Sequence, residues 1–231
     1  MSKASLAKQP KEVAAMFDEV AATYDLTNDL LSFGQDRLWR KSVAKLVDSK
    51  SGQKVLDLAA GTGSSSVAFV KPGVHVVASD FSEGMLAVGR KRHPELDFQF
   101  ADATNLPFKA NEFDTVTISF GIRNVVDVNQ ALKEMLRVTK PGGKLVICEF
   151  SKVNNAFFKP FYSIYLKGLL PLFSRLGSKT PEAYSYLSES IEAWPNQEQF
   201  KAQIQSSGWS EVSYRNLSLG IVAIHFAKKA A

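Results

Sequence analysis

The sequence predicts an α/β fold with a doubly wound, mostly parallel sheet, and three observations support this prediction. From residue 54 onward, short apolar runs alternate with helical patterns, as in repeated strand–helix–strand units. The first apolar run ends at a turn that contains Gly61 and Gly63, where a parallel sheet commonly binds a nucleotide. The last two strand patterns are separated by a short segment around Gly220. No crossover helix fits there, so we expect them to pair antiparallel.

The remaining elements follow from periodicity and from breaker residues. Residues 1–10 are polar and are expected to be loosely ordered. Residues 13–20 and 38–47 carry apolar side chains at helical spacing, whereas the polar, turn-rich stretch 24–34 receives no helical assignment. The expected strands are 54–58, 74–79, 97–100, 113–119, 144–150, 210–215 and 221–227, and the further expected helices are 64–70, 82–91, 128–138 and 197–206.

Residues 152–196 interrupt the alternation of strands and helices. Within them, 157–173 form the most aromatic and apolar part of the chain, which predicts either a helical cap buried on the sheet edge or a lid that covers an apolar substrate and touches lipid. Just upstream, the Pro-Gly-Gly sequence at 141–143 separates a helix from the fifth strand. We therefore predict an N-terminal helical segment, 1–50, that closes the active site, and a main domain, 51–231, that carries the insertion at about 152–196.

Composition limits the class of protein. A chain of 231 residues with 45% hydrophobic and 22% charged residues is typical of a globular domain. Cys148 is the only cysteine, so no internal disulfide forms, and its strand context predicts a buried core position. No run of 18 apolar residues occurs, and residues 1–13 lack the apolar core of a secretory signal, so we expect a cytoplasmic protein. The net charge of +5 leaves a nucleic acid or an anionic membrane open as a partner.

Acidic residues mark the carboxyl ends of three successive expected strands: Asp57, Asp80 and Asp102. Singly, they have ordinary explanations as a helix cap, a turn acid and a solvated loop residue. Together they indicate a shared ligand, because the carboxyl ends of parallel strands meet at one edge of the sheet. Gly61 and Gly63 let the backbone approach that ligand without a Cβ atom. Asp80 lies roughly 20 residues past the turn, where a carboxylate binds both ribose hydroxyls.

The glycine turn alone leaves two ligands open, a dinucleotide and S-adenosylmethionine. A dinucleotide motif prefers a third small residue, and this position holds Ser66. Asp102 can meet the amino group of an adenine, and the fourth strand ends at Ser119, where a methyl donor would lie. With the Pro-Gly-Gly turn and the terminal hairpin, these features favour S-adenosylmethionine.

Three segments resemble the ubiquinone/menaquinone biosynthesis C-methyltransferases: residues 24–39, 119–125 and 137–151. The resemblance extends from about residue 17 to residue 226, and the first segment is specific to this family. Thr27 departs from the usual methionine and Asp36 from a frequent histidine, which excludes a histidine base at position 36 and puts the exact substrate in doubt. Thr139 and Cys148 replace aliphatic residues, which we interpret as harmless variation.

The resemblance implies a Rossmann-like class I S-adenosylmethionine-dependent methyltransferase, with a seven-stranded sheet that ends in the antiparallel hairpin. It implies C-methylation of a polyprenyl quinol, with demethylmenaquinol favoured and 2-methoxy-6-polyprenyl-benzoquinol as the alternative. An RNA methyltransferase and a non-catalytic cofactor-binding module are the competing classes. The residues expected to bind the methyl donor, partly by family analogy, are Asp57, Gly61, Thr62, Gly63, Asp80, Phe81, Asp102, Ala103 and Ser119.

The expected catalytic residues are Arg123 and Asn124, just past the fourth strand, with Tyr24 and Asp25 brought over the crevice by the N-terminal segment. An arginine stays charged, so Arg123 is expected to stabilise a phenolate or to polarise a water molecule rather than to act as an unaided base. The alternative is that Arg123 pairs with a nearby acid and fixes a loop. No metal is expected, because none of the three histidines has a cysteine at ligand spacing.

The implied partners follow from the substrate. A prenylated quinol stays in the membrane, so we expect weak peripheral contact between residues 157–173 and an anionic bilayer, at the inner face of a bacterial cell membrane. We expect no nucleic-acid partner, since the basic residues are scattered. The sequence leaves a homodimer open.

Overall fold

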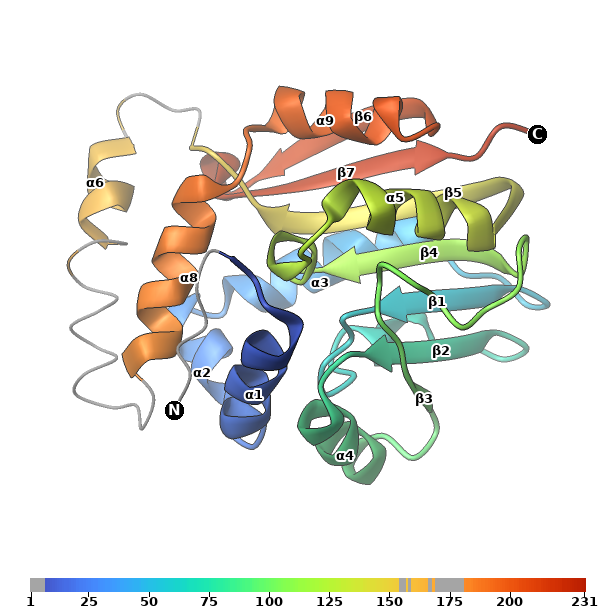
Figure 1. Cartoon of the computed structure of the whole chain (residues 1–231), viewed down its shortest axis with the longest axis horizontal. Helices are drawn as coiled ribbons and strands as arrows, with labels where there is room; N and C mark the ends of the chain where they lie inside the picture. The colour runs from blue at the N-terminus through green and yellow to red at the C-terminus, as the bar shows by residue number, and fades with distance from the viewer. Residues whose placement is uncertain (1–6, 154–156, 158, 166–167, 169–180) are drawn as a thin grey trace.

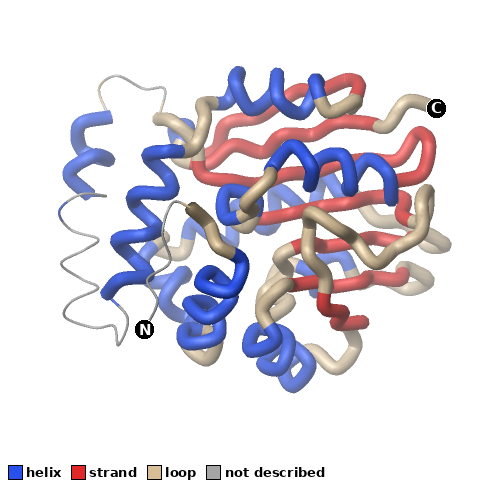
Figure 2. Tube along the Cα trace, in the orientation of Figure 1, coloured by secondary structure: helices blue, strands red, loops and turns tan. Residues whose placement is uncertain are grey.

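A seven-stranded sheet with helices on both faces forms the centre of the molecule (Figure 1, Figure 2). The computed structural model describes residues 7–153, 157, 159–165, 168 and 181–231. The strands are β1 (Lys54–Leu58), β2 (His75–Asp80), β3 (Asp97–Phe100), β4 (Phe113–Ser119), β5 (Thr139–Phe150), β6 (Ser210–Leu217) and β7 (Val222–Lys228). Their order is β3-β2-β1-β4-β5-β7-β6; the first five run parallel, and β7 is antiparallel to both neighbours. The predicted fold class is confirmed.

Each face of the sheet has its own apolar core, because successive strand residues point to opposite faces. In β5, Leu145 and Ile147 pack on the side of α5 and α9, whereas Val146 and Cys148 pack on the side of α3. Cys148 is fully buried, as predicted, and burial raises the pKa of its thiol. The covering helices are α3 (Gln35–Val47), α4 (Glu83–Arg92), α5 (Val128–Val138) and α9 (Gln197–Ser206).

Two local expectations were wrong. The predicted helix at 64–70 is only a short 3-10 helix, η1 (Ser66–Phe69). The helix ends at Phe69: Val70 is already extended, and Lys71 directly precedes Pro72, a position at which the helical conformation is disfavoured. Conversely, the turn-rich stretch at 24–34 contains a helix, α2 (Tyr24–Leu31), with Asp25 in the first turn, where an acid is favourable.

The fifth strand begins five residues earlier than expected. Its pairing with β4 jumps from Thr139 to Lys144, so the Pro-Gly-Gly sequence lies inside an irregular stretch of β5 instead of before it. Gly142 has a positive φ of 73°, and its N–H donates to the carbonyl oxygen of Lys229 at 3.0 Å. The chain beyond β7 therefore supplies backbone partners that hold this stretch in the sheet.

The N-terminal helix α1 (Pro10–Val20) is held against the start of α4, at the carboxyl end of the sheet (Figure 1). Asp18 Oδ1 accepts hydrogen bonds from Ser82 Oγ and from the N–H of Gly84, at 2.9 Å for the latter. A Cβ atom on Gly84 would lie 2.7 Å from Asp18 Oδ1, so the glycine permits this approach. A carboxylate at the N-terminus of a helix is favourable, so the contact of Asp18 with the start of α4 anchors α1 beside the sheet.

The insertion contributes α6 (Lys159–Ile164) and α8 (Pro181–Ala193), which lie on the same side of the molecule as α1 and α2 (Figure 1). Of the segment 157–173 that was predicted to contact lipid, positions 158, 166–167 and 169–173 lie outside the described residues. No helix in the described part of the chain is both long and apolar enough to cross a bilayer.

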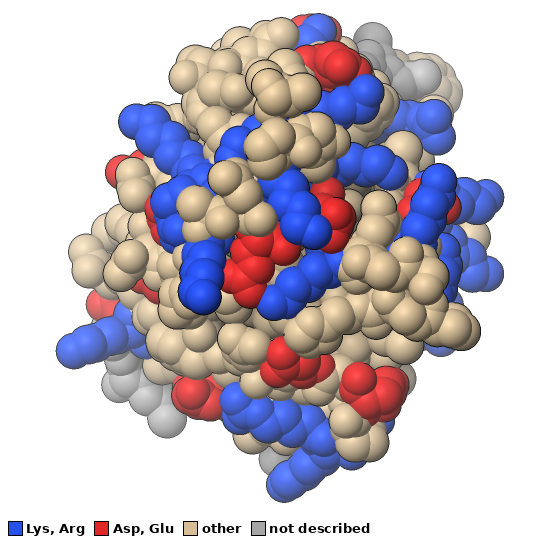
Figure 3. All heavy atoms as spheres, turned by 90° about the vertical axis from the view of Figure 1, so that its right-hand side faces the viewer, with Lys and Arg blue, Asp and Glu red and all other residues tan. Residues whose placement is uncertain are grey.

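The opposite end of the sheet carries mixed charge. In Figure 3, which views the right-hand side of Figure 1, basic groups are interspersed with acidic ones. Ion pairs account for part of this pattern, among them Lys140–Asp114 at 2.8 Å and Lys228–Glu211 at 2.7 Å. The described residues of this face therefore do not form a basic surface of the kind that binds a nucleic-acid backbone.

Candidate active site

A large cavity opens at the carboxyl ends of β1, β2 and β4, between the sheet, α1, α2 and the insertion. Its volume is about 1670 Å³, above the roughly 300–1,000 Å³ of a pocket for one small ligand. Among the described residues, every one predicted for the site lines this cavity except Gly63. Those that line it are Tyr24, Asp25, Asp57, Gly61, Thr62, Asp80, Phe81, Asp102, Ala103, Ser119, Arg123 and Asn124.

Asp80, at the end of β2, fastens the glycine turn. Its Oδ2 accepts the N–H of Gly61 at 2.8 Å, and its Oδ1 accepts the N–H of Ser82 at 2.8 Å. Burial raises the pKa of the Asp80 carboxyl, and these backbone hydrogen bonds oppose that shift. Gly61 has a positive φ of 57°, which glycine adopts without strain. The turn is thus preformed beside a carboxylate.

Glycine is needed at positions 61 and 63 for different structural reasons. A Cβ atom on Gly61 would meet nothing closer than Met85 Sδ at 3.9 Å, on the cavity side. At Gly63 it would lie 2.7 Å from the ring of Phe98 and 3.0 Å from Leu96. Gly63 therefore makes room for the core beneath the turn, while Gly61 keeps the cavity wall open.

Strained backbone brings the ends of β1 and β4 together. Ala59 and Phe120 follow these strands with positive φ values of 49° and 58°, which are unfavourable for residues with a Cβ atom. Next to Phe120, a Cβ atom on Gly121 would lie 2.3 Å from Ala59 Cβ. Such strain persists where the surrounding structure enforces it and is concentrated at functional sites.

Asp57 is fully enclosed at the floor of the cavity. Ser66 Oγ donates a hydrogen bond of 2.6 Å to Asp57 Oδ2, which ties η1 to β1. Burial raises the pKa of the Asp57 carboxyl to about 7, and the nearby Asp80 adds to the effect. Asp57 does not cap η1 as the alternative interpretation expected, because the N-cap is Ser65 and the hydrogen bond of Asp57 comes from the side chain of Ser66 instead of a backbone N–H.

The Asp57→Asn variant is expected to remove a pH dependence of stability. The folded-state pKa of about 7 exceeds the ordinary 3.8, so the folded protein keeps a proton that the unfolded chain releases as the pH rises. The free energy of unfolding of wild type, relative to the variant, should fall by roughly 4 kcal/mol between pH 4 and pH 7 and stay level above that. Urea unfolding at several pH values measures it. Parallel pH profiles of the two proteins would contradict the raised pKa.

Two further predicted contacts have unsatisfied polar atoms. Asp102 Oδ1 accepts from Thr104 N and Oγ1 at 2.8 and 2.7 Å, whereas its Oδ2 has no hydrogen-bond partner among the described residues. Ser119 Oγ at the end of β4 is buried and likewise lacks a partner in that part of the chain. Buried polar groups normally find a partner, so Ser119 Oγ fits the binding of a polar ligand, whereas Asp102 is only half-buried and its Oδ2 is open to a ligand or to water.

Arg123 is held by a buried ion pair. It lies in η2 (Ile122–Asn124), directly after β4, and its Nη1 donates to Glu149 Oε1 at 2.7 Å and to the carbonyl oxygen of Phe120 at 2.6 Å. The two charged side chains are only 6% and 2% exposed. The guanidinium lies over the ring of Phe150, 5.2 Å from its centroid, and its buried Nε has no partner among the described residues. Arg123 therefore fixes the loop and also presents positive charge to the cavity.

Asp25 locks the N-terminal helices onto the glycine turn. Its Oδ2 accepts from Thr62 Oγ1 at 2.6 Å and from Arg92 Nη1 at 2.6 Å. Arg40 Nη2 lies 3.9 Å from Asp25 Oδ1. Of the three basic residues that end α4, Arg90, Lys91 and Arg92, the last is thus bound by α2. Asp25 therefore lines the cavity beside Thr62, which was predicted to bind the methyl donor. Tyr24 lines the cavity next to Asp25, and burial raises the pKa of its hydroxyl.

Three residues in or beside the cavity were not predicted from the sequence: Lys8 and Tyr186 line it, and Glu149 lies behind Arg123. Lys8 lies over the Trp194 ring, 5.8 Å from its centroid, and burial lowers the pKa of its amine. Tyr186 comes from α8, and its hydroxyl donates to Asn124 Oδ1 at 3.1 Å. Glu149, which holds Arg123, is an acid inside an apolar strand, and that rare placement was a usable signal. Lys8 gave none, since it lies in a polar stretch. The described residues contain no cluster of three or more His, Cys, Asp or Glu that could hold a metal ion.

The strand order, the antiparallel last strand and the glycine turn beside Asp80 define the class I methyltransferase fold. Solved structures share it at low identity. The 4+2 cyclase SpnF has a TM-score of 0.71 and 18% identity, with 96% of this chain and 97% of that chain covered. Phosphoethanolamine N-methyltransferase 2 of Haemonchus contortus, in complex with S-adenosyl-L-methionine, has a TM-score of 0.62 and 18% identity, with 83% and 52% covered. The cyclase shows that this fold alone does not fix the reaction.

Sequence comparison is more specific. Demethylmenaquinone methyltransferases of Streptomyces avermitilis and Streptomyces griseus are 57% and 56% identical to this chain over 230 residues, with 100% of both chains covered. That of Clavibacter sepedonicus is 50% identical over 234 residues, with 100% of this chain and 96% of the relative covered. The chain belongs to the ubiE/COQ5 methyltransferase family, whose model matches residues 4–229. The predicted family and class of enzyme are confirmed.

Proposed function

We propose that this methyltransferase uses S-adenosylmethionine to methylate a ring carbon of demethylmenaquinol, a prenylated quinol. The observation that carries the proposal is the full-length identity of 50–57% to demethylmenaquinone methyltransferases. The cavity supports it, since its volume of about 1670 Å³ accommodates a donor and a bicyclic ring together. The favoured substrate remains the naphthoquinol, with the benzoquinol of ubiquinone biosynthesis as the alternative.

The residues at the carboxyl ends of β1 to β4 fit the donor. Asp80 would bind the ribose hydroxyls, and the free Oδ2 of Asp102 would accept from the adenine amino group. The unpartnered Oγ of Ser119 and the open wall at Gly61 fit the remaining polar part. When bound, S-adenosylmethionine supplies an electrophilic methyl group on a sulfonium, which needs little activation by the protein.

The protein's task is to make the quinol carbon nucleophilic and to align it. Transfer of the phenolic proton to water raises electron density at the adjacent ring carbon. A carbon–carbon bond then forms there as the sulfur–carbon bond of the donor breaks, and the ring proton passes to water, which restores the aromatic ring. The positive charge of Arg123, enclosed with Glu149, would stabilise the phenolate oxygen. Arg123 stays protonated, so it does not itself remove the proton. Asn124 and Tyr24 would contact the quinol beside it.

An apolar rim surrounds the cavity entrance and would receive the prenyl tail. Leu30 of α2, Phe33 just after α2 and Phe161 of α6 line the cavity, and they are 73%, 80% and 57% exposed. The segments touch, since the Oη of Tyr165, the residue after α6, donates to the carbonyl oxygen of Leu31, the last residue of α2, at 2.6 Å. Exposed apolar side chains in one patch are characteristic of a contact surface. We propose that this rim meets the inner face of the cell membrane and that the N-terminal segment, 1–50, closes the site.

Replacing Phe161 of the rim together with its exposed neighbour Phe157, each by serine, is expected to weaken binding to anionic vesicles. Both side chains are more than half exposed, and their rings lie 5.7 Å apart. Sedimentation with phosphatidylglycerol vesicles should show weak binding by wild type that decreases with salt, because basic residues add about 1 kcal/mol each near such a surface. Val70→Ser, on an exposed residue outside the cavity, is the matched control. Equal sedimentation of all three proteins would contradict the membrane contact.

A methyl-transfer assay tests the function. Protein, labelled S-adenosylmethionine and detergent are combined separately with reduced demethylmenaquinol, with reduced 2-methoxy-6-polyprenyl-benzoquinol and with RNA. Label in the naphthoquinol is the expected result. If the label appears mainly in the benzoquinol, the alternative substrate is the correct one. Label in RNA would overturn the quinol function. Donor binding without any product would indicate a cofactor-binding module.

A further inference from the structure

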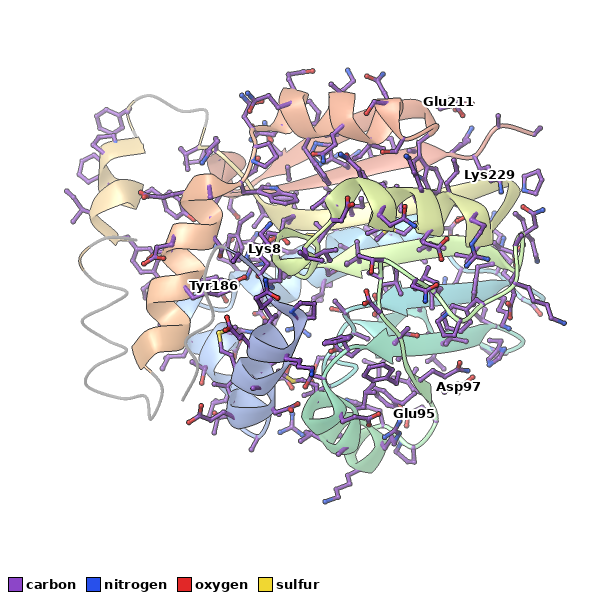
Figure 4. The ribbon with its side chains drawn as sticks, in the orientation of Figure 1. Lys8, Glu95, Asp97, Tyr186, Glu211 and Lys229 are labelled. Carbon is purple, nitrogen blue, oxygen red and sulfur yellow. The ribbon has the colours of Figure 1, made fainter. Side chains whose placement is uncertain are left out.

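Tyr186 joins the insertion to the predicted catalytic loop. It lies on α8, its side chain is 4% exposed, and it faces the carboxyl end of the sheet (Figure 4). Its hydroxyl donates a hydrogen bond of 3.1 Å to Asn124 Oδ1, across 62 residues of sequence. Both residues line the cavity. This contact is thus the point at which the covering helix reaches a residue of the site.

The hydrogen bond determines which end of the Asn124 amide is available. A carboxamide has an oxygen that accepts and a nitrogen that donates two hydrogen bonds. With Oδ1 engaged by the Tyr186 hydroxyl, the Nδ2 group is left as a donor, and it has no partner among the described residues. The backbone of Asn124 is also fixed, because its N–H donates to Gly121 at 3.0 Å. The backbone of Asn124 is thus held by Gly121, and its side-chain amide is held by Tyr186.

We propose that Tyr186 is a positioning residue for methyl transfer, which holds Asn124 so that Nδ2 donates to the phenolate oxygen of the bound quinol. This inference rests on the proposed quinol function. A phenolate oxygen accepts hydrogen bonds only, so a turned amide would set its own oxygen against that charge. With Arg123 as the adjacent residue, the correctly turned amide would add a second favourable group at the same oxygen.

Other roles for Tyr186 fit the geometry less well. As a base it would need to lose its own proton, but the hydroxyl donates that proton to Asn124, and burial raises its pKa above the ordinary value of 10.0. A role in packing alone would need only the ring. The hydroxyl is the atom that distinguishes positioning from packing.

The test measures kcat and KM for reduced demethylmenaquinol in wild type, Tyr186→Phe, Asn124→Ala and the double variant. Tyr186→Phe should lower kcat roughly tenfold, as expected for one lost hydrogen bond to a group that acts on charge. Donor binding by calorimetry should be unchanged and gives the number of folded sites. In the Asn124→Ala background, Tyr186→Phe should have no further effect, because the hydroxyl acts through Asn124. Tyr214→Phe, which loses a hydrogen bond of 2.9 Å to Glu198 outside the cavity, is the control and should match wild type.

Wild-type kcat in Tyr186→Phe, or an equal loss with and without Asn124, would overturn the inference. If Tyr186→Phe does not fold, Asn124→Asp tests the same idea with Tyr186 intact, because aspartate keeps an acceptor and loses the donor. Asn124→Asp should be as slow as Asn124→Ala, and full activity in it would also overturn the inference. A wild-type protein that methylates no quinol would instead refute the proposed function.

Discussion

Replacing Arg123 with alanine is expected to lower kcat for quinol methylation by roughly 100-fold or more, since the variant loses charge stabilisation in the transition state. The same change should destabilise the fold by about 3–5 kcal/mol, because it leaves the carboxylate of Glu149, which is 2% exposed, buried without its partner. Thermal unfolding, donor calorimetry and steady-state kinetics measure the three effects. The affinity for S-adenosylmethionine should change little per folded molecule.

A double variant separates catalysis from loop support. Arg123→Met combined with Glu149→Met removes both charges, and replacing a buried ion pair with apolar residues is often neutral or stabilising. We expect this protein to unfold near the wild-type temperature and to remain as slow as Arg123→Ala. If the double variant regains wild-type kcat, Arg123 only fixes the loop, and the alternative interpretation from the sequence is the right one.

Asp80→Ala is expected to raise the Kd for S-adenosylmethionine at least tenfold. Hydrogen bonds to a charged group contribute on the order of 1.5–3 kcal/mol each, and the variant loses those proposed for the ribose hydroxyls. It also loses the acceptor of the Gly61 N–H, at 2.8 Å, so the glycine turn should become less ordered. Isothermal titration calorimetry measures the affinity.

Asp97→Ala is a suitable comparison for Asp80→Ala. Asp97 begins the neighbouring strand β3, its side chain is 39% exposed, and it pairs with His75 outside the cavity. Its replacement should leave donor affinity unchanged. Donor affinity in Asp80→Ala that equals that of Asp97→Ala would exclude Asp80 from the binding site.

Local patterns predicted most of the framework because they reflect the environment of each segment. The helices 128–138 and 197–206 were predicted to the residue, since each combines an apolar stripe with an N-cap, Asp127 and Asn196. Strands β1, β3 and β4 also match, because turn residues or polar residues bound their apolar runs. The errors arose where contacts with another part of the chain determine the local structure. Helix α2 packs on α3, and the early part of β5 is paired with residues beyond β7.

The sequence by itself determined the fold class and the family. Of the thirteen predicted site residues, twelve line the cavity. This was possible because a glycine turn or an acid at the carboxyl end of a parallel strand always lies at the same edge of the sheet. Only the tertiary structure decided that Glu149 pairs with Arg123, that Asp25 bridges α2 to Thr62 and that Tyr186 donates to Asn124. These pairs join residues 26, 37 and 62 positions apart, and no local periodicity encodes which distant side chain completes a hydrogen bond.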